Sequence, residues 1–259
     1  MELIDTHCHL TFDELAGDIE AVIDRSKQAG VTGWVTVGTD AHHNVQAVAF
    51  ADRFANLYAA VGIHPHYAKD TTPADIAELK KFARNEKVVA IGETGLDFHY
   101  GLSHRHHQSR LFSRHLEIAA ELNLPVIIHS REAFDETMTV LEQFGHDIKR
   151  AVFHCFSYSA RQARIVLDSG FYVSFTGVVT FKNAQAARDA AAVVPLERLM
   201  IETDCPYMSP EPMRKQKVNE PAFLVHTATY IAQLKGMDAA DFARAVSAAT
   251  RGFFALPPG

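Results

Sequence analysis

Short apolar runs alternate with helical segments along the whole chain, and this alternation limits the folds that the chain can adopt. Eight runs have the length and the Val, Ile and Phe content of buried strands. They span residues 3–10, 33–40, 57–63, 88–96, 125–131, 150–156, 171–176 and 199–206. Because most of these runs are nearly continuous in apolar residues, they predict parallel strands that are covered by helices on both faces.

The segments between the runs have the spacing of apolar residues that is typical of helices. They span residues 13–29, 44–54, 73–84, 105–122, 133–144, 160–169, 183–194, 222–234 and 239–250. Eight strand–helix units predict an α/β fold of the (β/α)8 TIM-barrel class, which takes about 250 residues, so we expect a single domain over residues 1–259. An open doubly wound sheet is the alternative, but the chain lacks the Gly-rich first turn of the dinucleotide-binding version of that fold.

Residues that commonly bind metals stand at or near the ends of six predicted strands. His7 and His9 come first, and residues i and i+2 of a strand point to the same side, so their rings are expected to point together. The others are His64, His66, Glu93, His129, His154 and Asp204. The carboxyl ends of barrel strands form the active-site face. Chance histidines in an exposed strand could explain the first pair alone, but the recurrence favours one shared site.

The predicted ligand set consists of nitrogen and oxygen donors. Its members are His7, His9, Glu93, His129, His154 and Asp204. Six side chains exceed the three or four that one zinc ion needs, whereas two divalent ions about 3.5–4 Å apart would use them all. We therefore expect two divalent ions, with zinc, manganese, nickel, iron and magnesium left open. Glu93, on the middle strand of the set, is the expected bridge, and a hydroxide between the ions would be the nucleophile.

The order of these motifs resembles that of the TatD family of metal-dependent deoxyribonucleases, which belongs to the wider amidohydrolase-like barrels. The motifs are His7-x-His9, Gly62-Ile63-His64-Pro65, Gly92-Glu93-x-Gly95-Leu96-Asp97, Pro125-Val126-x-Ile128-His129-x-Arg131, His154-Cys155-Phe156 and Glu202-Thr203-Asp204-x-Pro206-Tyr207. The resemblance runs over nearly the whole chain. Tyr158, Thr94 and the missing Gly after Arg214 depart from the family's usual pattern, and these departures bear on substrate fit more than on the metal centre.

The resemblance also implies roles for the ligands. His7 and His9 would bind the first metal, and His129 and His154 the second. Glu93 would bridge the two ions as a catalytic ligand. Asp204, also catalytic, would join the first metal and orient or deprotonate the attacking water.

Four further residues are expected near the metals. Asp5 and Glu202 are predicted to orient ligating histidines, with a structural buried ion pair as the alternative. His64 is predicted to contact a substrate phosphate or leaving group, or else to cap its strand. Arg131, on the same strand face as His129, is predicted to hold a phosphate through paired hydrogen bonds, or else to form a surface salt bridge.

Two loops could contact nucleic acid if the barrel is correct. The His-rich loop 98–107, which contains Tyr100, could bind the phosphate backbone and stack a base, although such a stretch is more often a solvated loop. Arg214, Lys215 and Lys217 form a basic cluster after the eighth strand. A net charge of -6 argues against a basic nucleic-acid-binding domain, so only a local basic rim is expected.

The remaining composition indicates a cytoplasmic protein. Three widely spaced cysteines without a CxxC pair fit a reducing compartment. Glu2 and Asp5 stand where a secretory signal would be basic and then apolar, and no apolar run approaches the roughly 20 residues that span a bilayer. We therefore expect no membrane association. We also expect a monomer, and the resemblance implies DNA as its substrate.

The predicted function is hydrolysis of DNA phosphodiester bonds, most simply as an exonuclease acting at strand ends. Hydrolysis of amides or esters of small molecules is the alternative within enzymes. Barrels of that kind often carry a carboxylated lysine as the bridge, where this chain has Glu93. A metal-binding interaction protein without turnover is the alternative outside enzymes.

Overall fold

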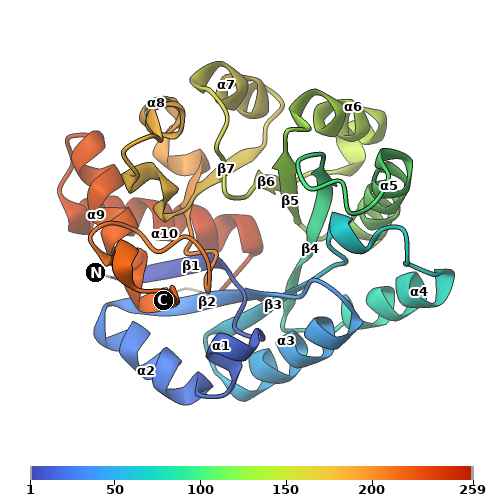
Figure 1. Ribbon diagram of the computed structural model, residues 1–259, viewed down its shortest axis with the longest axis horizontal. Coiled ribbons are helices and arrows are strands. Elements are labelled where there is room, and N and C mark those ends of the chain that lie inside the picture. The colour runs from blue at the N-terminus through green and yellow to red at the C-terminus, as the bar shows by residue number, and fades with distance from the viewer. Residues whose placement is uncertain (1, 258–259) are drawn as a thin grey trace. The chain divides into compact units, whose positions relative to one another are not determined.

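The computed structural model describes residues 2–257, whose strands form one eight-stranded sheet that keeps the order of the chain from β1 to β8. The strands are β1 (Leu3–Cys8), β2 (Val31–Val37), β3 (Leu57–Val61), β4 (Val88–Asp97), β5 (Val126–Arg131), β6 (Ala151–Phe153), β7 (Tyr172–Phe175) and β8 (Leu199–Ile201). Helices separate them as the sequence predicts (Figure 1). This is the element order of a (β/α)8 barrel, the predicted fold class.

The α-helices differ from their predicted bounds mainly at the ends. They are α1 (Asp13–Ala16), α2 (Ile19–Gln28), α3 (Ala41–Arg53), α4 (Pro73–Phe82), α5 (Arg105–Leu122), α6 (Phe134–Phe144), α7 (Ala160–Asp168), α8 (Gln185–Val193), α9 (Leu224–Leu234) and α10 (Ala239–Phe254). Short 3-10 helices are η1 (Pro65–Tyr67), η2 (Gly145–Asp147), η3 (Gly177–Thr180), η4 (Leu196–Arg198), η5 (Met213–Lys215) and η6 (Pro221–Phe223). In the described part of the chain, no helix combines the length and the apolar character needed to cross a bilayer.

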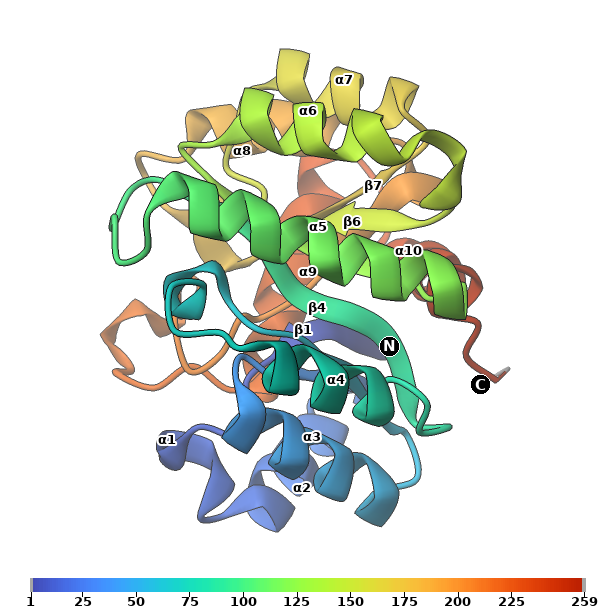
Figure 2. The ribbon, with the colours of Figure 1, turned by 90° about the vertical axis from the view of Figure 1, so that its right-hand side faces the viewer.

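The chain forms two compact units, which are residues 37–154 and the segments on either side of them. In the flanking unit, β1 pairs with β2 and β7 with β8, both in parallel, and α10 packs against β1 and β8. In the unit of residues 37–154, β3, β4, β5 and β6 pair in that order, also in parallel. Helix α5 lies along β4 with α4 and α6 on either side of it (Figure 2). The single domain expected over residues 1–259 stays a prediction.

Local sequence explains where several elements begin and end. Thr72 caps α4 in a reciprocal capping box with Asp75, and Pro73 follows at the first helical position, as predicted. The helix predicted over residues 13–29 is interrupted at Gly17 and Asp18, which separate α1 from α2. The eighth strand is shorter than predicted, because the chain leaves the sheet after Ile201 and adopts a left-handed conformation at Asp204, with φ of 53°.

His115, a residue without a predicted role, joins α5 to the end of β3. Its buried ring donates from Nδ1 to the carbonyl oxygen of Leu111 at 2.9 Å and accepts the N–H of Ile63 at Nε2, also at 2.9 Å. Only a neutral imidazole can make both bonds. Burial lowers the pKa of His115 to about 4, so the ring is neutral at pH 7 and holds the backbone next to His64.

Burial of a neutral His115 predicts a specific loss of stability in acid. An unfolded histidine titrates near pH 6.5 but His115 only near 4, so the unfolded state binds more protons between these values. Lowering the pH from 7 to 5 should therefore remove about 2 kcal/mol of the free energy of unfolding through this group alone. Denaturant unfolding at both pH values, with a chelator present, measures the loss.

The variant His115→Leu should lack this part of the pH dependence, and it should be less stable at pH 7 because the Ile63 N–H loses its acceptor. His146→Leu is the matched control, because His146 is exposed, and it should keep the wild-type dependence. If the free energy of unfolding of His115→Leu depended on pH as it does in the wild type, buried His115 would not be the source of the loss of stability in acid.

Candidate metal centre

The six predicted ligands lie in two clusters of buried or nearly buried side chains, one in each unit. The first cluster contains His7, His9 and Asp204, and the second contains Glu93, His129 and His154 together with His64. Most of them lie near or just beyond the carboxyl end of a strand, whereas Glu93 lies within β4, four residues before its end. Ionisable groups buried in this way are costly unless they are paired or bound to a metal.

The first cluster brings three ligand atoms together at nearly equal distances. The Nε2 atoms of His7 and His9 are 3.2 Å apart, which confirms that the two rings point together. Asp204 Oδ1 lies 3.6 Å from His7 Nε2 and 3.2 Å from His9 Nε2. Ligands about 2.05 Å from a tetrahedral ion are about 3.3 Å from one another, so these three atoms fit one divalent ion.

Backbone contacts fix the ligands of this cluster. The N–H of Asp204 donates to the carbonyl oxygen of His7, and the N–H of His9 donates to that of Cys205, each at 2.9 Å. The ring of Phe12 stacks on His9 with centroids 4.7 Å apart. These contacts hold the loop after β8 against the end of β1, so the ligand positions are set before any ion binds.

Asp5 strengthens the same connection between β1 and the loop after β8. Its carboxylate accepts the N–H of Thr203 at 3.0 Å, the Thr203 hydroxyl at 2.5 Å and the N–H of His7 at 3.4 Å. Burial raises the pKa of Asp5 to about 7, although these hydrogen bonds oppose the rise. Asp5 therefore contacts the backbone of His7, while its predicted role in orienting a ligating ring stays a prediction.

Glu202 lies beyond the end of β8, not on a strand face shared with Asp204. Its carboxylate accepts the N–H of Cys155 at 2.5 Å and the hydroxyl of Thr6 at 3.4 Å. These bonds tie the backbone at Cys155 to β1 through a buried carboxylate. The predicted action of Glu202 on a ligating histidine stays a prediction.

The second cluster converges on one oxygen of Glu93. Oε1 lies 2.7 Å from His129 Nδ1, 2.9 Å from His154 Nε2 and 3.5 Å from His64 Nε2. His129 Nδ1 and His154 Nε2 are 3.3 Å apart. Two imidazole nitrogens and a carboxylate oxygen are the types of ligand that suit zinc or a similar divalent ion. The bridging role of Glu93 stays a prediction.

Glycines and an asparagine permit the close approach of the strands that carry this cluster. A Cβ on Gly95, whose φ is 137°, would lie 2.0 Å from the carbonyl oxygen of His129. Asn44 pairs with both backbone groups of Gly62, and a Cβ on Gly62 would lie 2.5 Å from the carbonyl carbon of Gly92. Larger residues at these positions would displace the strand ends that carry His64 and Glu93.

The pKa values of the second cluster describe a site that is ready for a cation. Burial alone would raise the pKa of Glu93, but the adjacent His154 and His64 and the hydrogen bonds from His129 and His154 hold it well below its usual range. Burial lowers the pKa of His129, yet hydrogen bonds to Asp97 and Glu93 raise it overall. Glu93 is thus ionised, and a metal that binds His129 replaces a proton.

Asp97 is a residue of this site that the sequence analysis did not assign. Its Oδ2 lies 3.0 Å from His129 Nε2 and 3.1 Å from His66 Nε2, and its Oδ1 accepts the N–H groups of His99 and Tyr100. Despite its burial, bonds from these groups lower the pKa of Asp97 far below its usual range, so it is ionised. The sequence could have placed Asp97 at this site, because side chains alternate along a strand and residues 93 and 97 of β4 therefore lie on the same face.

The contact between Asp97 and His129 fixes which ring nitrogen faces the ligands. With Nε2 bonded to Asp97, His129 directs Nδ1 to Glu93 and His154. A carboxylate that holds the far nitrogen of a ligating histidine orients the ring and strengthens it as a ligand. Asp97 thus makes with the predicted ligand His129 the kind of contact that the sequence analysis expected of Asp5 and Glu202.

Arg131 contacts an aromatic ring. Its guanidinium lies 4.9 Å from the ring centroid of Tyr100, and the predicted grip on a phosphate stays a prediction. His66 lies in η1 and bonds to Asp97.

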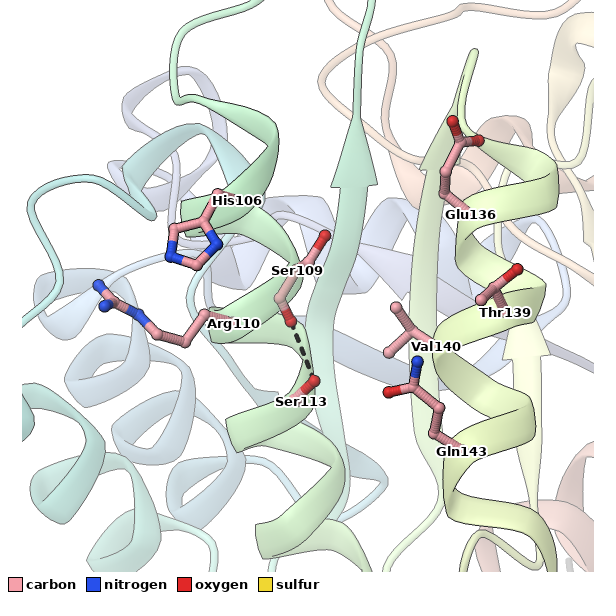
Figure 3. A pocket seen from close by; sticks show the side chains of 8 residues that line it. All are labelled: His106, Ser109, Arg110, Ser113, Glu136, Thr139, Val140 and Gln143. Atoms are coloured by element: carbon pink, nitrogen blue, oxygen red, sulfur yellow. Dashed lines mark hydrogen bonds between the residues drawn. The ribbon is translucent and has the colours of Figure 1, made fainter.

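A cavity of about 390 Å³ lies between α5 and α6 and contains none of the predicted site residues (Figure 3). Its lining comprises His106, Ser109, Arg110 and Ser113 from α5 and Glu136, Thr139, Val140 and Gln143 from α6. The hydroxyl of Ser113 donates to the carbonyl oxygen of Ser109 within its own helix. The cavity is open and lacks a convergent set of ligand atoms, so we assign the chemistry to the two clusters.

Removal of the charge on Asp97 should weaken metal binding in the second cluster. In Asp97→Asn the ring of His129 loses its ionised partner, so the affinity for zinc or manganese should fall about 10- to 100-fold. Equilibrium dialysis against a graded chelator, followed by elemental analysis, measures this loss independently of any activity. Asp75→Asn is the control, because Asp75 also accepts a backbone N–H but caps the exposed start of α4. Equal metal affinity in Asp97→Asn and the wild type would show that Asp97 does not support His129 as a metal ligand.

Comparisons with known proteins match nearly the full length of the chain. A family model described as TatD related DNase matches residues 4–255. The "Uncharacterized metal-dependent hydrolase YabD" of Bacillus subtilis is 41% identical over 235 residues, which cover 91% of this chain and 92% of the relative. The "3'-5' ssDNA/RNA exonuclease TatD" of Pantoea ananatis is 38% identical over 260 residues, or 98% of this chain and 100% of the relative.

A solved structure gives the same result for the fold. The crystal structure of YJJV, a TatD homologue from Escherichia coli, matches with a TM-score of 0.93 and 32% identity over 98% of each chain. The predicted (β/α)8 fold and the resemblance to a family of metal-dependent barrel enzymes are both confirmed. This chain belongs to the TatD family of metal-dependent hydrolases.

Proposed function

We propose that this hydrolase cleaves phosphodiester bonds of DNA from strand ends, as an exonuclease, with one divalent ion in each cluster. The observation that carries the proposal is the pair of buried His and carboxylate clusters with the spacing of metal ligands. The relatives named as 3'-5' ssDNA/RNA exonucleases support a nucleic-acid substrate. Cytoplasmic location and a monomeric state stay predictions.

Divalent ions held in these clusters supply positive charge to phosphoryl oxygens and lower the pKa of bound water. The ionised Glu93 and the carboxylate group of Asp204 are the predicted acidic ligands, and we assign to Asp204 the orientation and deprotonation of the attacking water. Its left-handed backbone and its N–H bond to the carbonyl of His7 fix the direction of this carboxylate.

His64 is suited to contact the substrate because its ring is neutral. Burial lowers the pKa of His64 to about 4, although Glu93 opposes the change. Its Nδ1 accepts the N–H of His66 at 3.2 Å, so the remaining proton is on Nε2, which points toward Glu93 at 3.5 Å. We assign to this N–H a hydrogen bond to a phosphoryl oxygen or to the leaving group.

Replacement of Glu93 tests the proposal directly. Glu93→Gln keeps the shape of the side chain but removes its charge, so cleavage of labelled single-stranded DNA should fall about 1,000-fold, since several kcal/mol of charge stabilisation is lost. The wild type should be inactive after chelation and active again with manganese, zinc or magnesium. Strands labelled at the 3' or 5' end, analysed over time, show whether shortening proceeds from an end.

Glu117→Gln is the matched control, because Glu117 is exposed on α5 and pairs with Arg114, and it should leave the rate unchanged. RNA, a small phosphodiester, an ester and an amide are assayed in parallel. Turnover of the ester or the amide alone, or undiminished DNA cleavage by Glu93→Gln, would contradict the proposal.

A further inference from the structure

The loop between β4 and α5 presents an aromatic side chain to solvent. Tyr100 is 55% exposed, yet its backbone N–H is anchored to the carboxylate of Asp97 at 3.1 Å. The N–H of His99 donates to the same oxygen at 3.0 Å. The exposed ring is therefore carried by a backbone that a buried charge holds in place.

Neighbouring side chains orient the ring of Tyr100. The guanidinium of Arg131 packs over it at 4.9 Å from the centroid, and Arg131 Nη1 lies 3.5 Å from the Tyr100 hydroxyl oxygen. The rings of His66 and His99 meet it nearly perpendicularly, with centroids 5.4 Å and 4.8 Å away. More than half of the tyrosine stays uncovered in spite of these contacts.

One carboxylate connects this ring to the second metal cluster. Asp97 Oδ1 binds the backbone of Tyr100, and Asp97 Oδ2 binds His66 and His129. His129 in turn contacts Glu93 through Nδ1. The exposed tyrosine is thus separated from a metal-ligating histidine by a single bonded side chain.

We propose that Tyr100, backed by Arg131, is a stacking platform for one nucleobase of a single strand whose phosphate enters the second cluster. This inference rests on the proposed nuclease function and names its substrate class. A fixed aromatic ring stacks any base, because every base has a π-face, whereas the bases of an intact duplex already stack on one another. The platform therefore selects single-stranded ends with little preference for sequence.

The charges around the platform suit this ligand. The guanidinium of Arg131 contacts the tyrosine ring while its N–H groups can still reach a phosphate. Arg105 packs over Phe98 in the same loop at 4.0 Å, and Glu132 is paired with His99 at 2.6 Å. For a chain with a net charge of -6, stacking supplies affinity that does not depend on a basic surface.

The variant Tyr100→Ala tests the platform, because it removes the ring and keeps the backbone N–H that Asp97 binds. For single-stranded DNA its KM should rise about 5- to 150-fold, the loss expected for one stacked base, while kcat stays near the wild-type value. Tyr100→Phe should restore the wild-type KM. Leu102→Ala is the matched control, since Leu102 is 53% exposed in the same loop and has no π-face. Metal content, measured for each variant, should be unchanged.

Two substrates separate base stacking from other contacts. On a strand whose terminal nucleotides are abasic, Tyr100→Ala and the wild type should have the same KM. A single strand with 2-aminopurine near its end should lose fluorescence on binding the wild type and Tyr100→Phe but not Tyr100→Ala.

The outcomes distinguish this inference from the proposed function. Cleavage with no dependence on residue 100, an equal rise in KM on the abasic strand, or a preference for duplex rejects the platform and keeps the nuclease. Quenching that depends on residue 100 without any cleavage keeps the platform and rejects the nuclease. If neither quenching nor cleavage is observed, both the stacking platform and the nuclease function are rejected.

Discussion

Several ionisable side chains are buried close together near the strand ends. The rest of this structure depends on compensating for the hydration that these groups lose. Glu93 is 3% exposed and has the nitrogens of His129, His154 and His64 around one of its oxygens. A buried carboxylate is tolerable only when neighbouring groups or a cation compensate for its lost hydration. The hydrogen-bonded surroundings of the cluster follow from this requirement.

Those surroundings are built largely from backbone groups. In the flanking unit, Asp5 and Asp204 join the end of β1 to the segment after β8 through N–H donors. In the other unit, Asp97 collects two imidazoles and two backbone N–H groups on one carboxylate. Asp5 and Asp97, which are not predicted ligands, thereby limit the movement of the predicted ligands or of the backbone next to them, so binding of an ion needs little reorganisation.

Strands and helices could be predicted from the sequence because their alternation of side chains and their start positions depend on residues close together in the chain. Strand alternation placed His7 beside His9, and apolar spacing predicted that the helix α4 begins at residue 73. The same alternation misled at Glu202 and Asp204, because β8 ends at Ile201 and a left-handed residue redirects the chain. Asp adopts the left-handed conformation more often than most residues, but the bond that stabilises it here comes from β1, so the residue type alone does not predict the turn.

The interior partners of the site were harder to predict, since they depend on which helix face meets which loop. The resemblance implied a set of ligands and included Asp97 in a motif without assigning it a role. His115 was left without a role because a histidine in a helix is usually unremarkable, and only the contact with Ile63 distinguishes it. Long-range contacts of this kind are set by tertiary packing, which a single sequence does not specify.

Helix α5 shows what such packing implies for the evolution of the site. Gln108 brackets the backbone of Asp97 with bonds to both its N–H and its carbonyl, and His115, two turns further along, accepts the N–H of Ile63. One helix thus fixes the positions of two segments that carry predicted site residues. A single-residue insertion or deletion between positions 108 and 115 would rotate one of these contacts by about 100° away from its loop. Transplanting this centre to another barrel would therefore require the outer helix to travel with the strands.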